Sequence, residues 1–233
     1  MSNAAIIVAA GRGTRMGPGM DKIFLPVAGQ PVIAHSWRAF EACPQIDSIV
    51  LVVREGMEAH FERLAAELGF RKPFRLAAGG PQRQDSVWNG LQRLDAGVKL
   101  VAIHDGARPC VTQELILATL EAARRTGAAT AAHPLTDTIK KSEDGRLISG
   151  TLDRSKLWAV QTPQTFRVEI IRRALEEAQR RGLSLTDDNA ACELVGQPVE
   201  LVHCKTPNPK VTVPSDLPWI EWLLKNAQAA APC

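Results

Sequence analysis

The sequence lacks the features that mark membrane, disulfide-rich or nucleic-acid-binding proteins. Its five cysteines are an odd number and none forms a CxxC pair, so a disulfide framework or zinc site is disfavoured against reduced, buried thiols. No stretch approaches the roughly 20 apolar residues that span a bilayer, and the N-terminus lacks the pattern of a signal peptide. The net charge of +3 is too small to indicate nucleic acid, although it suits a site for small anions. We therefore expect a cytoplasmic protein that binds neither membrane nor nucleic acid.

Apolar runs alternate with amphipathic segments over the first 132 of the 233 residues. Continuous apolar runs predict buried strands at 5–10, 47–53, 74–78, 98–104 and 128–132. Apolar residues at helical spacing predict helices at 31–42, 57–68, 84–94 and 112–125. Because the strands are continuously apolar rather than alternating, we expect an α/β fold, with a mostly parallel sheet covered by helices on both faces.

Residues 134–160 interrupt this alternation. They hold two polar, β-branched runs on either side of Asp144-Gly145, which is a hairpin signal. The hairpin has too few apolar residues to form a core, so we expect it to project from the sheet and to pack against a symmetric partner. Beyond it the pattern predicts helices at 167–181 and 187–195, a strand at 199–203 and a last helix after 208–217.

A glycine-rich, basic loop follows the first predicted strand. A dinucleotide fingerprint requires G-x-G-x-x-G at this point, and here Gly11 and Gly13 are in place but Met16 stands at the third position. The loop also runs about twenty residues before the next helix, whereas a dinucleotide loop opens its helix at once. The Walker pattern GxxxxGK[ST] is missing as well. The loop contains three cations, which are Arg12, Arg15 and Lys22. Fixed cations suit a triphosphate, whose negative charge grows at the leaving group during attack on the α-phosphorus.

Three further clusters carry polar residues near predicted strand ends. His104-Asp105 ends one strand, and a carboxylate at the carboxyl edge of a parallel sheet is a natural Mg²⁺ ligand beside phosphates. A packed, structural role is the better interpretation of His104, and a turn or cap is the alternative for Asp105.

The second cluster is Gly79-Gly80, which would let the backbone approach a flat base, with Arg83 and Ser86 following. Taken alone, Ser86 would be interpreted as a helix cap. Lys210 follows two prolines, so its backbone is stiff and can place the side chain, and a solvent-facing lysine is the alternative.

These pieces together resemble a known family. The motifs run in order across nearly the whole chain, as AAGRGTRM with its later lysine, GGPQRQDSV, HDGARP, TDTIK, TLDR with LWAVQTPQ, TDD and NPKVT. In this order they closely resemble the 2-C-methyl-D-erythritol 4-phosphate cytidylyltransferase family of the non-mevalonate isoprenoid route. The resemblance implies one nucleotidyltransferase domain over residues 1–233, with a Rossmann-like sheet and a dimerisation arm at 134–160.

The resemblance also implies a reaction and a set of site residues. The expected reaction joins CTP and methylerythritol 4-phosphate, with Mg²⁺, into 4-diphosphocytidyl-2-C-methylerythritol and pyrophosphate. The implied transition-state cations are Arg15 and Lys22, and the implied acceptor-positioning cations are Arg154 and Lys210. The implied nucleotide-binding residues are Ala9, Ala10, Gly11, Gly13, Gly79, Arg83 and Ser86. The implied substrate-contacting residues are Asp105, Arg108, Thr138 and Thr162, with Asp105 also the metal ligand. The implied assembly is a homodimer that exchanges its arms.

The sequence departs from the family pattern at two positions. The family usually has proline where this chain has Val8, and proline before the loop lysine where this chain has Asp21. A carboxylate at Asp21 would weaken the electric field of Lys22 next to it.

Three alternatives remain open from the sequence. A cytidylyltransferase for another polyol phosphate, such as ribitol 5-phosphate, would share the nucleotide half of the motif set. An NAD-dependent oxidoreductase is disfavoured by the misplaced third glycine and by Val53-Arg54, where an acidic residue should end the second strand. A non-catalytic nucleotide sensor is disfavoured because both loop cations, the carboxylate and the acceptor-side cations are all retained.

Overall fold

A seven-stranded sheet forms the centre of the protein. The computed structural model describes residues 2–11, 13 and 21–229. The strands are β1 (Ser2–Val8), β4 (Ser48–Val53), β5 (Phe74–Ala78), β6 (Val98–Asp105), β7 (Ala128–Pro134), β10 (Trp158–Arg167) and β11 (Glu200–His203). They lie in the order β11-β7-β10-β6-β1-β4-β5, and every neighbouring pair is parallel except the two that involve β10. The expected mostly parallel α/β architecture is confirmed.

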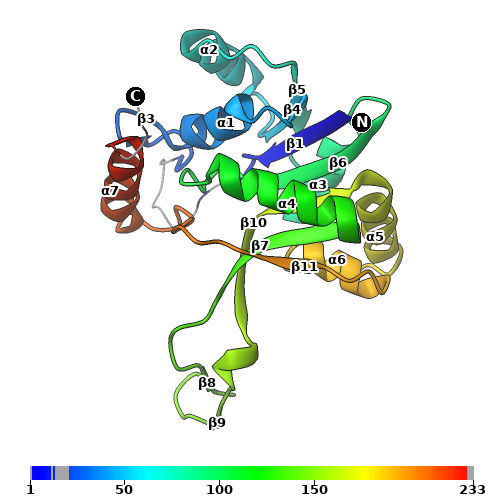
Figure 1. Cartoon of the computed structure of the whole chain (residues 1–233), viewed down its shortest axis with the longest axis vertical. Coiled ribbons are helices and arrows are strands. Elements are labelled where there is room, and N and C mark those ends of the chain that lie inside the picture. Colours follow the sequence, from blue (N-terminus) through cyan, green and yellow to red (C-terminus); the bar gives the residue numbers. More distant parts are fainter. Residues whose placement is uncertain (1, 12, 14–20, 230–233) are drawn as a thin grey trace.

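Helices cover both faces of this sheet (Figure 1). One face carries α1 (Val32–Ala42), α2 (Glu58–Leu68), α4 (Gln113–Thr126) and α7 (Asp216–Ala229). The other face carries α3 (Arg83–Leu91), α5 (Val168–Arg180) and α6 (Asp188–Leu194). Two buried cores result, the first built around Trp37, Phe40 and Phe61, and the second around Phe166. The continuously apolar strands are thereby explained, because each one is covered on both sides.

Local signals set several helix ends. The Thr112 side chain accepts a hydrogen bond from the backbone N–H of Leu115, so it caps α4 as predicted. Gly69 and Gly127 follow α2 and α4 in the left-handed conformation, with φ of 67° and 91°. A residue with a Cβ is strained in that conformation, which accounts for glycine at both ends.

The central strand β10 was not predicted from the sequence. Its residues, WAVQTPQTFR, include a proline and five polar side chains, which ordinarily indicates a loop. In the structure Pro163 falls at a register shift between Val160 and Gln164, where the ladder with β7 is interrupted. Gln164 and Thr165 are buried, and each makes hydrogen bonds that replace those to water. β10 runs antiparallel between β6 and β7, so a single reversed strand lies inside the parallel sheet.

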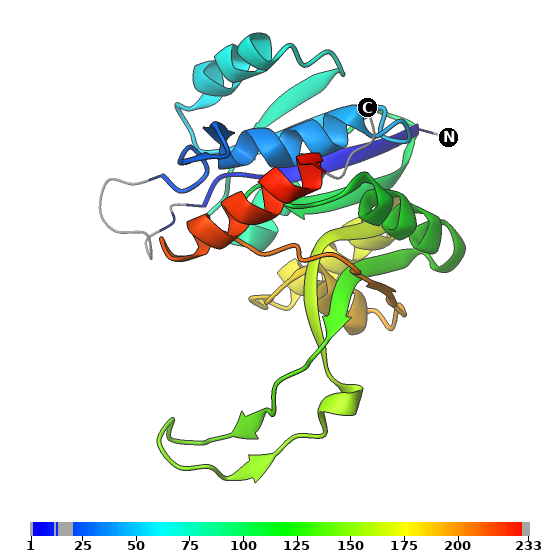
Figure 2. The same ribbon diagram turned by 60° about the vertical axis from the view of Figure 1, so that its left-hand side comes forward.

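The arm at 134–160 projects from the body, as predicted (Figures 1 and 2). Its strands are short, since β8 (Lys140–Lys141) and β9 (Gly150–Thr151) pair over two residues each, and a 3₁₀ turn follows at Arg154–Lys156. Asp144-Gly145 lies between the two strands, as the hairpin signal indicated, within a loop that spans 142–149. Asp144 accepts backbone N–H groups from Arg146 and Leu147, and this local bonding competes with a strand ladder.

Two smaller observations complete the fold. A two-stranded hairpin, β2 (Pro26–Val27) with β3 (Gln30–Pro31), precedes α1 and was also missed from the sequence. Among the described residues, no helix has both the length and the apolar character that crossing a membrane requires.

Candidate functional site

A cavity of about 410 Å³ opens at the carboxyl ends of β1 and β6. Three segments far apart in the sequence line it: the loop after β1, the turn from β5 into α3, and the end of β6. Lys22 and Lys210 complete its wall. Its position agrees with the general rule that ligands of open α/β sheets bind beyond the carboxyl ends of the strands.

The loop after β1 forms one wall of the cavity through its backbone. Ala9 is buried and its N–H donates to Val52 O at 2.8 Å, while Ala10 and Gly11 face the cavity. Gly13 has a φ of 60°, and a Cβ added there would lie 3.2 Å from Cγ of Lys22. Glycine is therefore needed for both the conformation and the close passage of the lysine stem. Arg12 and Arg15 lie outside the described residues.

Lys22 lies inward rather than in solvent. It is 9% exposed, lines the cavity, and its Nζ donates to Val211 O at 3.0 Å. Of the three loop cations, Lys22 is the one that the structure describes, and its predicted action on a triphosphate stays a prediction. The neighbouring Asp21 carboxylate lies against the Arg54 guanidinium in an ion pair.

The turn from β5 into α3 is built for close backbone approach. A Cβ on Gly79 would lie 2.3 Å from Cβ of Ala10, so any larger residue would push the two segments apart. Ser86 lies inside α3 and does not cap it; its Oγ accepts the Gly80 N–H at 3.0 Å and donates to Gln82 O at 3.2 Å. The interpretation of Ser86 as a cap was therefore wrong, and it fixes the Gly80 turn instead.

A network of ion pairs with alternating charges lies at the cavity. Asp188, at the start of α6, accepts from Arg83 Nη1 at 2.8 Å, and Arg83 Nε donates to Asp105 Oδ1 at 3.1 Å. Lys210 Nζ donates to the other oxygen, Asp105 Oδ2, at 2.7 Å, and Arg108 Nε lies 4.0 Å from it. Burial alone would raise the pKa of Asp105, but Arg83, Lys210 and Arg108 hold it well below its usual range. Asp105 is therefore ionised, and it gathers the three cations around itself.

His104 and Thr162 are hydrogen-bonded to the backbone and side chains behind this ion-pair network. The buried Thr162 Oγ accepts the Asp105 N–H at 3.1 Å and lies 3.0 Å from His104 Nδ1, while His104 Nε2 lies 3.1 Å from Arg108 O. A carbonyl can only accept, so Nε2 carries the proton and Nδ1 accepts from the threonine hydroxyl. Burial lowers the pKa of His104 to about 4, which keeps the ring neutral. The structural interpretation of His104 is confirmed.

This network changes what can be expected of Thr162. Its single hydroxyl proton is directed to His104 and a lone pair takes the Asp105 N–H. The residue therefore holds the end of β6 from below, and it does not line the cavity. Asn208 joins the same network, because its Nδ2 donates to Thr162 O and its own carbonyl accepts from Arg108, both at 2.8 Å.

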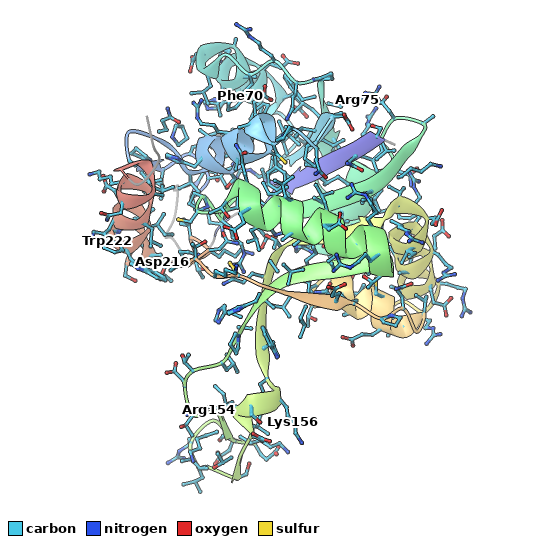
Figure 3. The ribbon with its side chains drawn as sticks, in the orientation of Figure 1. Phe70, Arg75, Arg154, Lys156, Asp216 and Trp222 are labelled. Carbon is cyan, nitrogen blue, oxygen red and sulfur yellow. The ribbon has the colours of Figure 1, made fainter. Side chains whose placement is uncertain are left out.

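Two predicted site residues lie elsewhere in this chain. Thr138 and Arg154 are exposed residues of the arm, and Arg154 donates to Thr136 O within it. Figure 3 shows Arg154 well away from the sheet and its helices. Within one chain, Thr138 and Arg154 therefore do not lie beside Lys210, Arg108 and Asp105 at the cavity.

The described side chains around the cavity offer few ligands for a metal ion. Among the described residues no group of three or more His, Cys, Asp or Glu side chains could hold one. Asp105 is the one carboxylate among the described residues that line the cavity, and both of its oxygens already accept from cations. A carboxylate oxygen can accept a second interaction, so Asp105 fits as a single ligand of an ion whose other ligands are phosphate oxygens and water.

Sequence reasoning missed Asp188 and Asn208 as parts of this site. Both lie in motifs noted above, TDD and NPKVT, but neither was given a role. A signal was available for Asp188, since an aspartate at a helix start is either a cap or a buried ion-pair partner. Its side chain is 1% exposed, which the sequence alone did not indicate.

Comparison with known proteins agrees with the motif order. A family model described as 2-C-methyl-D-erythritol 4-phosphate cytidylyltransferase matches residues 3–226. The cytidylyltransferase of that name from Pelotomaculum thermopropionicum is 43% identical over 226 residues, covering 97% of this chain and 95% of the relative. Its namesake from Geobacillus kaustophilus is 44% identical over 229 residues, covering 98% and 100%.

Solved structures show the same fold. The 4-diphosphocytidyl-2C-methyl-D-erythritol synthase of Anaerococcus prevotii superposes with a TM-score of 0.85 at 30% identity, over 96% of each chain. The 2-C-methyl-D-erythritol 4-phosphate cytidylyltransferase of Thermus thermophilus superposes with a TM-score of 0.80 at 31% identity, over 97% of this chain and all of the other.

Proposed function

The chain belongs to the 2-C-methyl-D-erythritol 4-phosphate cytidylyltransferase family, and we propose that the cavity between β1, β5 and β6 is where it carries out this reaction. The enzyme transfers CMP from CTP to 2-C-methyl-D-erythritol 4-phosphate, giving 4-diphosphocytidyl-2-C-methyl-D-erythritol and pyrophosphate. An acceptor phosphate oxygen attacks the α-phosphorus, the bond to the bridging oxygen breaks, and pyrophosphate leaves with that bond's electron pair. The observation that carries the proposal is that the inward-facing Lys22 and the Asp105–Lys210 pair line the same cavity.

The nucleotide occupies the side of the cavity formed by β1 and β5. Gly79 packs closely against Ala10, so the two segments form one wall of backbone against which a flat base can lie. Ser86 holds the neighbouring turn in place. Gly11 and Gly13 direct backbone N–H groups to the triphosphate, while Lys22 and Arg15 meet the charge that develops on the leaving pyrophosphate. Charges fixed before the reaction stabilise the transition state without reorganisation, which is why buried placement of Lys22 matters.

The acceptor occupies the other side, where cations gather. Lys210 also lines a neighbouring cavity of about 560 Å³, and Arg108 and Trp219 belong to the wall of that second cavity. An incoming phosphate replaces Asp105 as the partner of Lys210, so the lysine is already in position before the acceptor binds. Thr162 and His104 support this side from below rather than touching the substrate.

Mg²⁺ is the proposed cofactor, and Asp105 is its proposed protein ligand. When bound, the ion would neutralise charge on the triphosphate. Chelation should abolish turnover and added Mg²⁺ should restore it, whereas full activity of Asp105→Asn at limiting Mg²⁺ would remove Asp105 from this role.

A homodimer with exchanged arms is the proposed assembly. It is supported by the exposed apolar residues Leu147, Ile148 and Leu152 in the arm, and by the position of Arg154 in the arm, away from the sheet (Figure 3). A hairpin this short is marginal alone, and a second copy of the chain is the commonest partner for a soluble protein. In such a dimer the Arg154 and Thr138 of one chain would reach the acceptor side of the other.

Subunit mixing tests the shared site. Arg154→Ala and Lys22→Ala each disable both sites of their own homodimer. If arms are exchanged, a heterodimer of the two carries both lesions in one site and none in the other, so about half of the wild-type activity returns. A verified heterodimer without recovered activity would mean that each arm serves its own chain.

Acceptor choice is tested by pyrophosphate release. With CTP, the enzyme should release pyrophosphate with 2-C-methyl-D-erythritol 4-phosphate far faster than with ribitol 5-phosphate or other sugar phosphates. A preference for ribitol 5-phosphate would leave the nucleotide half of the proposal standing and overturn the acceptor.

A further inference from the structure

An ion pair next to Lys22 is not explained by any role assigned so far. Asp21 precedes Lys22, and its Oδ2 accepts from Nη2 of Arg54, the residue that follows β4. Both side chains are partly buried, at 19% and 32% exposure for Asp21 and Arg54. The second carboxylate oxygen of Asp21 is buried without a hydrogen-bond partner, and Arg54 is the largest of the influences that offset the burial of this group.

The pair ties a short turn to the sheet. Asp21 O accepts the Phe24 N–H at 3.0 Å, which closes a turn containing Lys22 and Ile23, and Ile23 O accepts the Ile33 N–H at 2.9 Å. On its other side Lys22 reaches Val211 O through Nζ. The backbone that carries Lys22 is therefore connected through the Asp21 side chain to the end of β4, close to the nucleotide wall of the cavity.

The same pair offsets the negative charge that Asp21 places next to Lys22. A carboxylate one residue from Lys22 lowers the positive potential that the lysine presents, and it repels a triphosphate. Burial raises the pKa of Asp21, while the Arg54 guanidinium opposes this rise. With Arg54 in place the two side chains cancel, and Lys22 retains its net positive field in the cavity.

We propose that Arg54 is a positioning residue for Lys22, which neutralises Asp21 and holds the 21–24 turn against the end of β4. This inference rests on the proposed function of Lys22 in stabilising the leaving pyrophosphate. Arg54 itself does not line the cavity and touches no reacting atom.

The test compares single and double variants by steady-state kinetics. Arg54→Gln leaves a partly buried, unpaired carboxylate beside Lys22, so kcat should fall about tenfold, with a smaller change in KM for CTP. Asp21→Asn removes the carboxylate charge and should cost less than Arg54→Gln. The double variant Asp21→Asn/Arg54→Gln should therefore be more active than Arg54→Gln alone. Arg54→Lys, which keeps the charge, should recover most of kcat.

A matched control separates this role from general loss of an ion pair. Arg75 on β5 forms a more exposed ion pair with Asp95, outside the residues that line the cavity, and Arg75→Gln should leave kcat unchanged. In the Lys22→Ala protein, Arg54→Gln should lower kcat no further, because Arg54 acts through Lys22. A purely structural role would lower kcat equally in both backgrounds.

The outcomes distinguish this inference from the proposed function. Unchanged kcat in Lys22→Ala would overturn the role of Lys22 itself. If Lys22→Ala lowers kcat but Arg54→Gln does not, or if the double variant is as impaired as Arg54→Gln, the positioning role of Arg54 is overturned. Should Arg54→Gln fail to fold by circular dichroism, the comparison of Arg54→Lys with Asp21→Asn/Arg54→Gln decides, and inactivity of both would refute the proposal.

Discussion

Acidification should destabilise this protein through His104. The ring is fully buried, packs 5.1 Å from the Phe40 ring, and uses both nitrogens in hydrogen bonds to Thr162 and Arg108. An imidazolium would carry a proton on Nδ1, directed at the threonine hydroxyl, and would place an unpaired charge in the core. For this reason burial lowers the pKa of His104 to about 4.

The direction and size of the effect follow from proton linkage. Below pH 6.5 the unfolded chain binds a proton on this histidine, while the folded protein does not bind it until about pH 4. The unfolded state is thus favoured as the pH falls from 6.5 to 4. At pH 5, roughly 1.5 pH units below 6.5, the loss is about 2 kcal/mol of unfolding free energy, at about 1.4 kcal/mol per pH unit.

Urea unfolding at pH 7 and pH 5 measures this loss, and His104→Gln provides the comparison. Glutamine can still donate to Arg108 O but does not titrate. Burial also lowers the pKa of His35, and this residue is present in both proteins. The difference between the two pH dependences therefore isolates His104. We expect the wild-type protein to lose about 2 kcal/mol more than His104→Gln between the two pH values.

Equal pH dependence in the two proteins would refute the reasoning. It would mean that the folded protein protonates His104 as readily as the unfolded chain does. The hydrogen-bond assignment that gives Nδ1 to the Thr162 hydroxyl would then be wrong as well.

Three further predictions concern neighbouring positions. Thr162→Val should lower the unfolding free energy by about 2–4 kcal/mol, because two buried groups lose their partner, whereas Thr162→Ser should cost about 1 kcal/mol; urea unfolding distinguishes them. Gly79→Ala should raise KM for CTP more than it lowers kcat, because its Cβ would collide with Ala10 at the nucleotide wall; unchanged kinetics would contradict that close approach. Asp188→Ala should cost about 3 kcal/mol of unfolding free energy and lower kcat/KM, because Arg83 loses one of its two carboxylates; a stability equal to wild type would contradict the buried pair.

Most of the α/β framework could be predicted from the sequence. Continuous apolar runs identified five of the seven sheet strands to within a few residues, the later pattern added β11, and Thr112, Gly69 and Gly127 marked helix ends. The glycine loop and the strand-end Asp105 could also be placed at one edge of the sheet. These features are decided locally, because hydrophobic period, capping side chains and glycine conformations act over a few residues.

Strand β10 could only be found in the tertiary structure. Its polar, proline-containing sequence satisfies none of the local rules for a central strand, and it is stable there because its neighbours complete its hydrogen bonds. Thr165 bonds Thr119 on α4, and Gln164 bonds the first turn of α6. Such partners compensate a buried polar side chain, and they come from other parts of the chain.

For the charged residues of the site, too, the sequence determined which residues are present and the tertiary structure decided which of them pair. The sequence by itself determined that Asp105, Arg83, Lys210 and Lys22 are present near predicted strand ends and loops. Tertiary structure decided that Asp105 lies between Arg83 and Lys210, which are 22 and 105 positions away from it along the chain. It also decided that Asp21 pairs with Arg54, 33 positions away. Ion pairs depend on distance and burial in space, and these are set only when the parallel strands bring their carboxyl ends together.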